Sequence, residues 1–178
     1  MMHPEGAVLD LGCGDNKYPG SVGVDHYPFD GVDLVANLDH TPWPLAADGY
    51  DHIIVSHLIE HVTDIPAFMN EVHRVGRHGA LVEVTTPHFS SHDSYQDPTH
   101  RWHLGTLWPQ IFCQGYLRSR VAPFSMVSVD VSFGKNLRYW FPKLAIRAKG
   151  LGWWEKNYAF VYPGRDMITR LRVEKPAV

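Results

Sequence analysis

The clearest candidate ligand site in this sequence is an apolar segment that ends in a carboxylate and two glycines, VLDLGCG at residues 8–14. Gly12 and Gly14 let the backbone turn sharply and let a ligand lie against it without an obstructing Cβ. A turn of this kind after a buried strand is where nucleotide-like cofactors bind in open α/β sheets. Because Asp10 puts negative charge at the turn, we expect the site to repel a pyrophosphate and to attract a positively charged cofactor.

A polar, histidine-rich segment at residues 88–103 is the second candidate site, and three interpretations of it are open. In the first, His88 or His100 is a general base oriented by Asp97, because histidine titrates near neutral pH. In the second, the segment binds zinc or iron, although the spacing matches no specific metal motif and no ligand set is assigned. The candidate ligands are His88, His92, Asp93, Asp97, His100 and His103. In the third, Asp97 caps a turn and the histidines hold the loop by hydrogen bonds.

The elements that would position these residues alternate between strand and helix or loop, which is typical of a parallel sheet in an α/β fold. Apolar and β-branched runs predict strands at 7–11, 22–25, 32–38, 52–56 and 80–86. An amphipathic helix is predicted between the last two, with Thr63 or Asp64 as its N-cap. Later patterns predict a helix at 107–117, a strand at 126–133 and an antiparallel, half-exposed strand at 168–173. We expect the aromatic and basic residues 135–156 to form an amphipathic helix that covers the sheet or the pocket.

The connection between the first two strands, residues 15–21, is short and contains Pro19-Gly20. A parallel crossover normally needs about a dozen residues and a helix, so we predict a shortened first crossover without a proper helix. A pyrophosphate site depends on the N-terminus of that helix. The short crossover therefore argues against NAD or FAD, whereas a cofactor without phosphate loses little.

Length and composition predict one globular domain, with 178 residues and a formal net charge of −3. That charge provides no basic field for nucleic acid, and no apolar run reaches the length of a membrane span. Cys13 and Cys113 have no CxxC spacing, and the N-terminus lacks the pattern of a secretory leader. We therefore expect reduced thiols in a cytoplasmic protein.

Together these segments resemble the class I S-adenosylmethionine-dependent methyltransferases, particularly the type 11 group, over residues 7–87. The resemblance implies a Rossmann-like three-layer α/β sandwich with S-adenosylmethionine as its cofactor. It implies that the glycine turn lies against the methionine moiety, that Asp25 binds the ribose hydroxyls, and that Asn37 with Leu38 meets the adenine. The implied cofactor-binding residues are Asp10, Gly12, Gly14, Asp25, Asn37, Leu38 and Ser56, the last of them beneath the methyl donor.

The sequence departs from that family at its beginning, where only six residues precede the first strand instead of a helix or more. We therefore expect the N-terminal helix to be missing and one face of the sheet to be open or covered by another subunit. A homodimer is one way to cover it. Within the single domain 1–178, residues 7–87 would be the cofactor-binding half and residues 88–178 the substrate or cap half.

The resemblance implies methyl transfer to an oxygen or nitrogen of a small-molecule acceptor, with His88, His100 and Asp97 as candidate catalytic residues. Two other functions stay open. The chain could be a non-catalytic S-adenosylmethionine-binding subunit that needs a partner, or a metal-dependent enzyme that uses residues 88–103. A nicotinamide-dependent oxidoreductase ranks last, because Asp10 and the short crossover both oppose a pyrophosphate.

Overall fold

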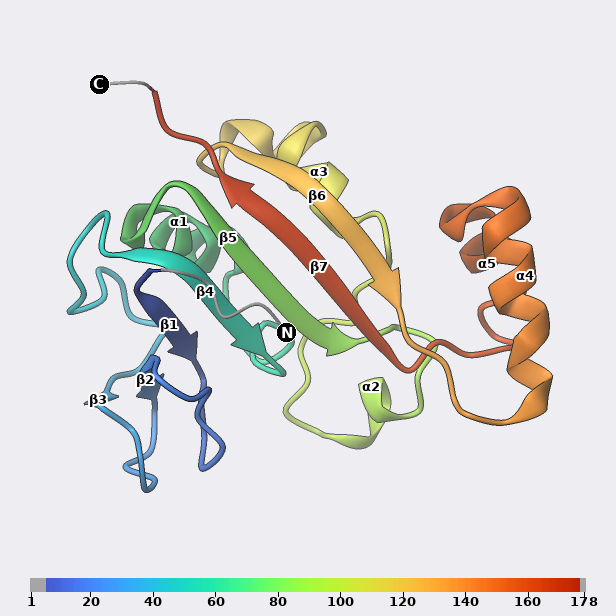
Figure 1. Ribbon diagram of the computed structural model, residues 1–178, viewed down its shortest axis with the longest axis horizontal. Helices are drawn as coiled ribbons and strands as arrows, with labels where there is room; N and C mark the ends of the chain where they lie inside the picture. Colours follow the sequence, from blue (N-terminus) through green and yellow to red (C-terminus); the bar gives the residue numbers. More distant parts are fainter. Residues whose placement is uncertain (1–5, 177–178) are drawn as a thin grey trace.

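A computed structural model describes residues 6–176 as one seven-stranded sheet with helices (Figure 1). The strands in chain order are β1 (Val8–Leu11), β2 (Val22–Asp25), β3 (Leu34–Val35), β4 (Tyr50–Ser56), β5 (Gly76–Pro87), β6 (Phe124–Val131) and β7 (Asp166–Val173). They lie in the order β3-β2-β1-β4-β5-β7-β6, with β1 to β5 parallel and β7 antiparallel to both of its neighbours. The predicted Rossmann-like α/β fold with an antiparallel C-terminal strand is confirmed.

The helices are α1 (Ile65–Val75), α2 (Asp93–Gln96), α3 (Trp108–Cys113), α4 (Trp140–Lys149) and α5 (Leu151–Tyr158), with short 3-10 turns at Tyr116–Ser119 and Leu137–Tyr139. α1 begins where the sequence predicts, because the Asp64 carboxylate accepts a hydrogen bond from Ala67 N at 3.0 Å. Its apolar face, which includes Phe68 and Val72, is buried in the core, and α3 adds Trp108 to the same cluster. None of the described helices is long and apolar enough to cross a membrane.

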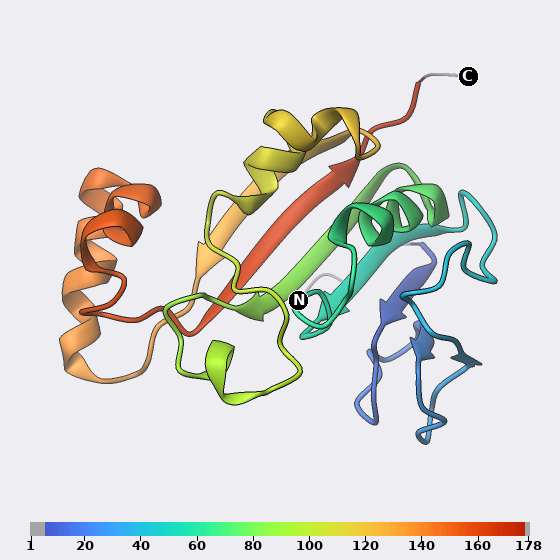
Figure 2. The same ribbon diagram turned by 180° about the vertical axis from the view of Figure 1, so that it is seen from behind.

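Both α1 and α3 lie on one face of the sheet, and the described helices leave the opposite face uncovered (Figure 1 and Figure 2). The strands alternate accordingly, since Ile53 and Val55 of β4 are buried whereas His52 and Ile54 are partly exposed. No helix precedes β1 in residues 6–176, and the chain crosses from β1 to β2 without one. The shortened crossover is thus confirmed.

β3 is shorter than predicted, because only Leu34 and Val35 pair with β2 instead of residues 32–38. The chain leaves the strand at Asn37, whose side-chain oxygen accepts a hydrogen bond from Asp39 N at 3.0 Å. Such a contact forms a turn. The turn keeps Asn37 and Leu38 at the carboxyl end of the sheet, beside the end of β2.

The C-terminal strand β7 shows the predicted alternation of buried and partly exposed residues, but it lies between β5 and β6. The edge of the sheet is β6, which spans Phe124–Val131 rather than 126–133. A bulge between Met126 and Ser128 shifts its register against β7. Phe133 lies beyond the end of the strand instead of continuing its apolar face.

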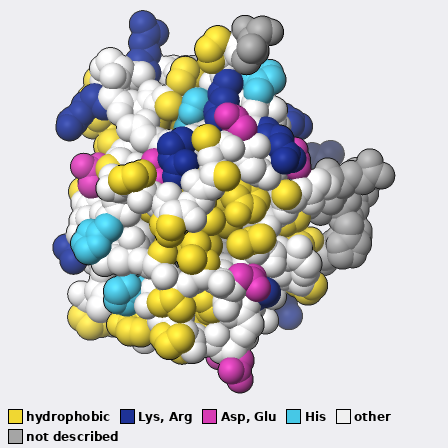
Figure 3. Space-filling model, turned by 90° about the vertical axis from the view of Figure 1, so that its left-hand side faces the viewer, with side chains coloured by type: hydrophobic (Ala, Val, Ile, Leu, Met, Phe, Trp, Pro, Cys, Tyr) yellow, Lys and Arg dark blue, Asp and Glu magenta, His cyan; other side chains and the backbone are white. Residues whose placement is uncertain are grey.

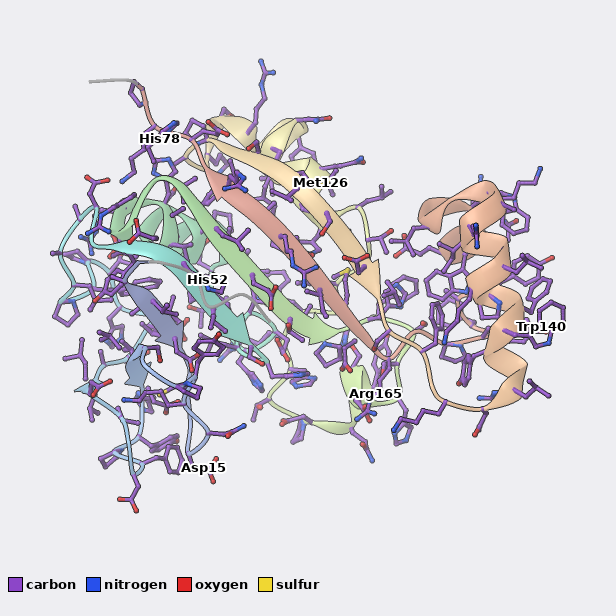
Figure 4. The ribbon with its side chains drawn as sticks, in the orientation of Figure 1. Asp15, His52, His78, Met126, Trp140 and Arg165 are labelled. Atoms are coloured by element: carbon purple, nitrogen blue, oxygen red, sulfur yellow. The ribbon has the colours of Figure 1, made fainter. Side chains whose placement is uncertain are left out.

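Residues 135–156 are helical, but they do not cover the sheet. α4 and α5 pack on each other beyond the ends of β6 and β7 (Figure 1). Trp140 of α4 projects away from the sheet (Figure 4) and is 58% exposed. α5 is anchored to the rest of the fold through the fully buried Trp154, which packs against His88 and Phe133. The expectation that this segment covers the sheet was therefore wrong.

Candidate functional site

The glycine turn after β1 has a backbone conformation that glycine adopts most easily, with φ of +71° at Gly12 and +55° at Gly14. The N–H groups of Gly12 and Cys13 donate to the carbonyl oxygen of Val24 in β2, at 2.8 and 3.2 Å. A Cβ at Gly12 would lie 3.1 Å from the side chain of Leu58, which follows β4. The turn is therefore packed tightly between β2 and the segment after β4.

Asp25, at the end of β2, holds this turn in place. One carboxylate oxygen accepts a hydrogen bond from Gly14 N at 2.9 Å, and the other accepts one from Tyr27 N at 2.9 Å. An ionised carboxylate has about four acceptor positions, so positions remain on both oxygens. Since Asp25 lines a cleft, these positions can receive hydrogen bonds from the hydroxyls of a ligand.

The cleft has a volume of about 330 Å³ and lies at the carboxyl ends of the strands. Four of the predicted cofactor-binding residues line it: Gly12, Asp25, Asn37 and Leu38. Asn37 keeps its NH₂ group for a ligand, because its hydrogen bond to Asp39 N uses only the oxygen. Leu38 is buried and provides an apolar wall.

A second hollow of about 390 Å³ lies on the other side of Gly12 and is lined by Asp10 and Ser56. Asp10 is 4% exposed and accepts a hydrogen bond from Tyr18 N at 2.8 Å. Burial raises the pKa of the Asp10 carboxyl, and this hydrogen bond only partly opposes the effect. The two hollows share Gly12, so the predicted cofactor-binding residues surround a single turn.

Several residues that line the cleft lie outside the predicted cofactor-binding set, notably Tyr27, Asp39, Leu58 and His61. Tyr27 and Asp39 each lie two residues after a predicted site residue, Asp25 and Asn37. Their closeness to the ends of β2 and β3 could therefore have indicated that they line the cleft. Leu58 and His61 follow β4, where the chain turns toward α1. The outer surface beside β3 is partly apolar (Figure 3), and the side chain of Tyr27 is 60% exposed.

The histidine-rich segment is fastened to the short stretch 60–62 after β4. The carbonyl oxygen of Glu60 accepts hydrogen bonds from Arg101 N at 2.8 Å and from Trp102 N at 3.2 Å. The indole of Trp102 donates to the carbonyl oxygen of Val62 at 2.7 Å. These contacts place residues 99–102 beside the cleft, next to His61.

Asp97 orients Thr99 and not His100. Its carboxylate accepts hydrogen bonds from Thr99 N at 2.8 Å and from Thr99 Oγ1 at 2.6 Å. Thr99 Oγ1 lies 2.9 Å from His61 Nδ1, whereas His100 Nδ1 lies 3.0 Å from the carbonyl oxygen of Ser94. Of the interpretations considered for Asp97, the turn cap fits this geometry.

His88 is fully buried and does not line the cleft. Its Nδ1 lies 2.8 Å from Ser90 Oγ, and its Nε2 lies 3.1 Å from Glu155 Oε1. The ring also packs against Trp154, with centroids 5.2 Å apart. Because both ring nitrogens are engaged and the side chain is inaccessible, this geometry favours a structural role over that of a general base.

The metal ligands considered within residues 88–103 are not brought together. His92 and Asp93 are exposed, and His103 stacks on Tyr95 with its Nδ1 2.9 Å from Ser94 Oγ. In residues 6–176 one group of three possible ligands does converge, namely Glu60, His61 and His100. Only His100 belongs to the set considered from the sequence.

We expect Glu155→Gln to lower the melting temperature in a pH-dependent way. Burial alone would raise the pKa of Glu155, but hydrogen bonds from His88 and Thr106 lower it below 4.5. A carboxylate with a lowered folded-state pKa stabilises the fold fully above its unfolded-state pKa, and this contribution is lost as the pH falls through the folded value. The melting temperatures of the two proteins should therefore differ most near neutral pH and converge as the pH falls below 4.5.

The matched control is Asp15→Asn, since Asp15 is exposed and makes no side-chain hydrogen bond within the described part of the chain (Figure 4). Thermal unfolding of all three proteins followed by circular dichroism measures the effect. A Glu155→Gln difference that stayed constant down to about pH 3 would contradict the assigned ionised pairing.

Comparison with known proteins adds an independent result. A sequence model of the family described as "Methyltransferase domain" matches residues 3–144, whereas no curated protein matches the sequence. A SAM-dependent methyltransferase structure from Archaeoglobus fulgidus aligns with a TM-score of 0.64 at 17% identity, over 93% of this chain and 85% of that chain.

Two further structures share the fold. The cyclase SpnF aligns with a TM-score of 0.59 at 14% identity, over 94% of this chain and 75% of that chain. A complex of the Haloferax volcanii Trm112 methyltransferase activator with a methyltransferase aligns with a TM-score of 0.58 at 15% identity, over 95% of this chain and 83% of that chain. These low identities show the fold alone, but the family match covers most of the chain. The chain therefore belongs to the class I S-adenosylmethionine-dependent methyltransferases.

Proposed function

We propose that this chain binds S-adenosylmethionine at the glycine turn and transfers its methyl group to an oxygen or nitrogen of a small-molecule acceptor. The observation that carries the proposal is the position of Asp25. Its carboxylate fixes the turn through Gly14 N and still has free acceptor positions facing the cleft. This is the contact that a ribose with two adjacent hydroxyls requires.

The charges around the turn support a cationic ligand. Asp10 and Asp25 line the two hollows on either side of Gly12, and no described helix begins directly after the turn. A helix N-terminus would favour a phosphate, whereas carboxylates favour a positive charge. When bound, S-adenosylmethionine supplies an electrophilic methyl group on a positively charged sulfur.

The residues of this chain would contribute mainly by holding the two reactants in line. Orientation of this kind supplies a large part of the rate of a two-substrate displacement. Asp25, Asn37 and Leu38 would hold the adenosine portion, and Asp10 with Ser56 would lie along the methionine portion. The acceptor would approach from the side of residues 88–103, which are fastened beside the cleft at Glu60 and Val62.

Isothermal titration calorimetry of the full chain with S-adenosylmethionine, followed by an assay for S-adenosylhomocysteine release, tests the proposal. We expect a dissociation constant in the range of about 1 μM to 1 mM that is usual for enzyme substrates. We also expect the release of S-adenosylhomocysteine to depend on an added small-molecule acceptor. The acceptors would be pooled hydroxyl and amine compounds. Absence of binding at about 1 mM cofactor would contradict the assignment of the cleft.

A non-catalytic binding subunit is the second candidate function, and the sheet face that the described helices leave uncovered favours it (Figure 1 and Figure 2). A domain that exposes one face of its sheet can require a partner for full structure. Cofactor binding without turnover against any acceptor would support this function. Turnover by the isolated chain would contradict it.

We also propose that the chain forms a homodimer in the cytoplasm. The exposed aromatic side chains of α4 and α5, Trp140 and Trp153, support the homodimer because aromatic residues are enriched at interfaces. The two free cysteines, Cys13 and Cys113, support a reducing compartment. Light scattering after size exclusion tests the oligomer, and the mass of a single chain would contradict it.

A further inference from the structure

We propose that Glu60, His61 and His100 bind one divalent transition-metal cation of the zinc type at the edge of the cofactor cleft. One nitrogen or carboxylate oxygen from each of the three residues lies within 4.8 Å of those from the other two. His61 also lines the cleft, so the cluster borders the site described above. This site differs from the metal interpretation of residues 88–103, because two of its three ligands come from the segment after β4.

The strongest sign of a missing ligand is Glu60. This residue is only 1% exposed, yet neither of its carboxylate oxygens has a hydrogen-bond partner among the described residues. His57 Nδ1 lies 3.4 Å from Glu60 Oε1, which is within ion-pair distance but long for a hydrogen bond. Burying a carboxylate that accepts no hydrogen bond is costly, so buried charges are normally hydrogen-bonded, paired or bound to a metal.

Both histidines are prepared to act as metal ligands. His100 Nδ1 lies 3.0 Å from the carbonyl oxygen of Ser94, which can only accept, so Nδ1 carries the proton and Nε2 has a free lone pair. Thr99 Oγ1 donates to Asp97 and therefore accepts from His61 Nδ1, which leaves Nε2 of His61 free in the same way.

This arrangement is typical of histidines that bind metals. A metal-bound imidazole usually donates its other N–H to a carbonyl, a carboxylate or a similar oxygen, and this contact fixes both the tautomer and the ring. Here Ser94 holds His100, while the pair Thr99 and Asp97 holds His61. In this proposal Asp97 is a positioning residue, because it orients the metal ligand His61 through Thr99 and is not itself catalytic.

The ligand types select the class of cation. Two imidazoles and one carboxylate suit zinc or ferrous iron, whereas magnesium and calcium prefer oxygen ligands. Three protein ligands leave at least one coordination position open. Because residues 99–102 are fastened beside the cleft, an acceptor that approaches from their side could occupy that position.

The consequence for catalysis rests on the proposed function. A cation in this position would lower the pKa of a coordinated acceptor hydroxyl, whose proton passes to water. The oxygen lone pair is then available for the methyl group. The site therefore favours a hydroxylated acceptor over an amine, and His100 would act as a ligand instead of a general base.

Calorimetric titration of the full chain, purified without a histidine tag and treated with a chelator, tests the site with Zn²⁺ alone. We expect one ion per chain. Glu60→Gln preserves the shape of the side chain, and we expect it to weaken binding at least ten-fold, which corresponds to about 1.4 kcal/mol. His100→Asn should do the same and serves as the second variant if Glu60→Gln does not fold.

His103→Asn is the matched control, because this histidine belongs to the same segment but not to the cluster. Cobalt substitution gives a second readout, since tetrahedral and octahedral Co²⁺ differ in visible absorption. Unchanged Zn²⁺ affinity in both Glu60→Gln and His100→Asn, or no stoichiometric binding by the unmodified chain, would overturn the proposal. Neither outcome depends on S-adenosylmethionine, so a failure here is distinguishable from a failure of the proposed function.

Discussion

Asp25→Ala is expected to weaken the binding of S-adenosylmethionine by about ten- to a hundred-fold, which corresponds to about 1.4 to 2.8 kcal/mol. The substitution removes the acceptor positions offered to the ribose. It also removes the partners of Gly14 N and Tyr27 N, which Asp25 holds at 2.9 Å each. Both losses act in the same direction, because a turn that is no longer held in place must be ordered when the cofactor binds.

Calorimetry with S-adenosylmethionine measures this effect directly. Asp25→Asn provides a graded comparison, since the amide keeps one acceptor oxygen but presents N–H groups where a backbone N–H already points. Asp30→Ala is the matched control, because this exposed carboxylate lies in the loop after β2 and lines neither hollow. Equal affinities of Asp25→Ala and the unmodified protein would refute the role given to this carboxylate.

Gly12→Ala is expected to weaken S-adenosylmethionine binding by about ten-fold or more and to destabilise the fold by about 1–2 kcal/mol. The destabilisation arises because φ is +71° at this position, a conformation that alanine adopts with strain. The loss of binding arises because the new Cβ would lie 3.1 Å from Leu58. Leu58 lines the cleft, so a shift of its side chain would change the wall of the cofactor site.

Gly20→Ala separates these two effects. Gly20 has a similar φ of +80°, but a Cβ there meets no atom within 4 Å, and the residue lines neither hollow. We expect this variant to lose stability by a similar amount in denaturant titrations while it keeps its affinity for the cofactor. If both variants lost affinity equally, backbone strain would account for the effect and the proposed contact at Gly12 would be wrong.

Much of the fold was predictable because its signals are local. The β-branched run Ile53-Ile54-Val55 predicts a strand, and Asp64 predicts the start of α1. The short connection 15–21 likewise predicts a crossover without a helix, as the structure shows. The extents of β3 and β6 were predicted less well, since a side-chain turn at Asn37 and a bulge after Met126 decide them.

The histidines show why the acceptor side was harder to predict than the cofactor side. His88 and His100 are equally plausible bases in the sequence, because both are titratable residues in one polar segment. The structure separates them, since His88 is completely buried against Glu155, which is 67 residues away in the chain. No feature near His88 in the sequence indicates that partner.

By itself, the sequence determined the fold class and the residue types around the glycine turn, because strands and the turns that follow them depend on neighbours within a few positions. Only the tertiary structure decided which distant segments meet. It brings His61 to Thr99, 38 residues further on, and it buries Glu60 nearby without a hydrogen-bond partner among the described residues. Contacts of this kind depend on how a long loop docks on the sheet, and local spacing carries no information about that docking.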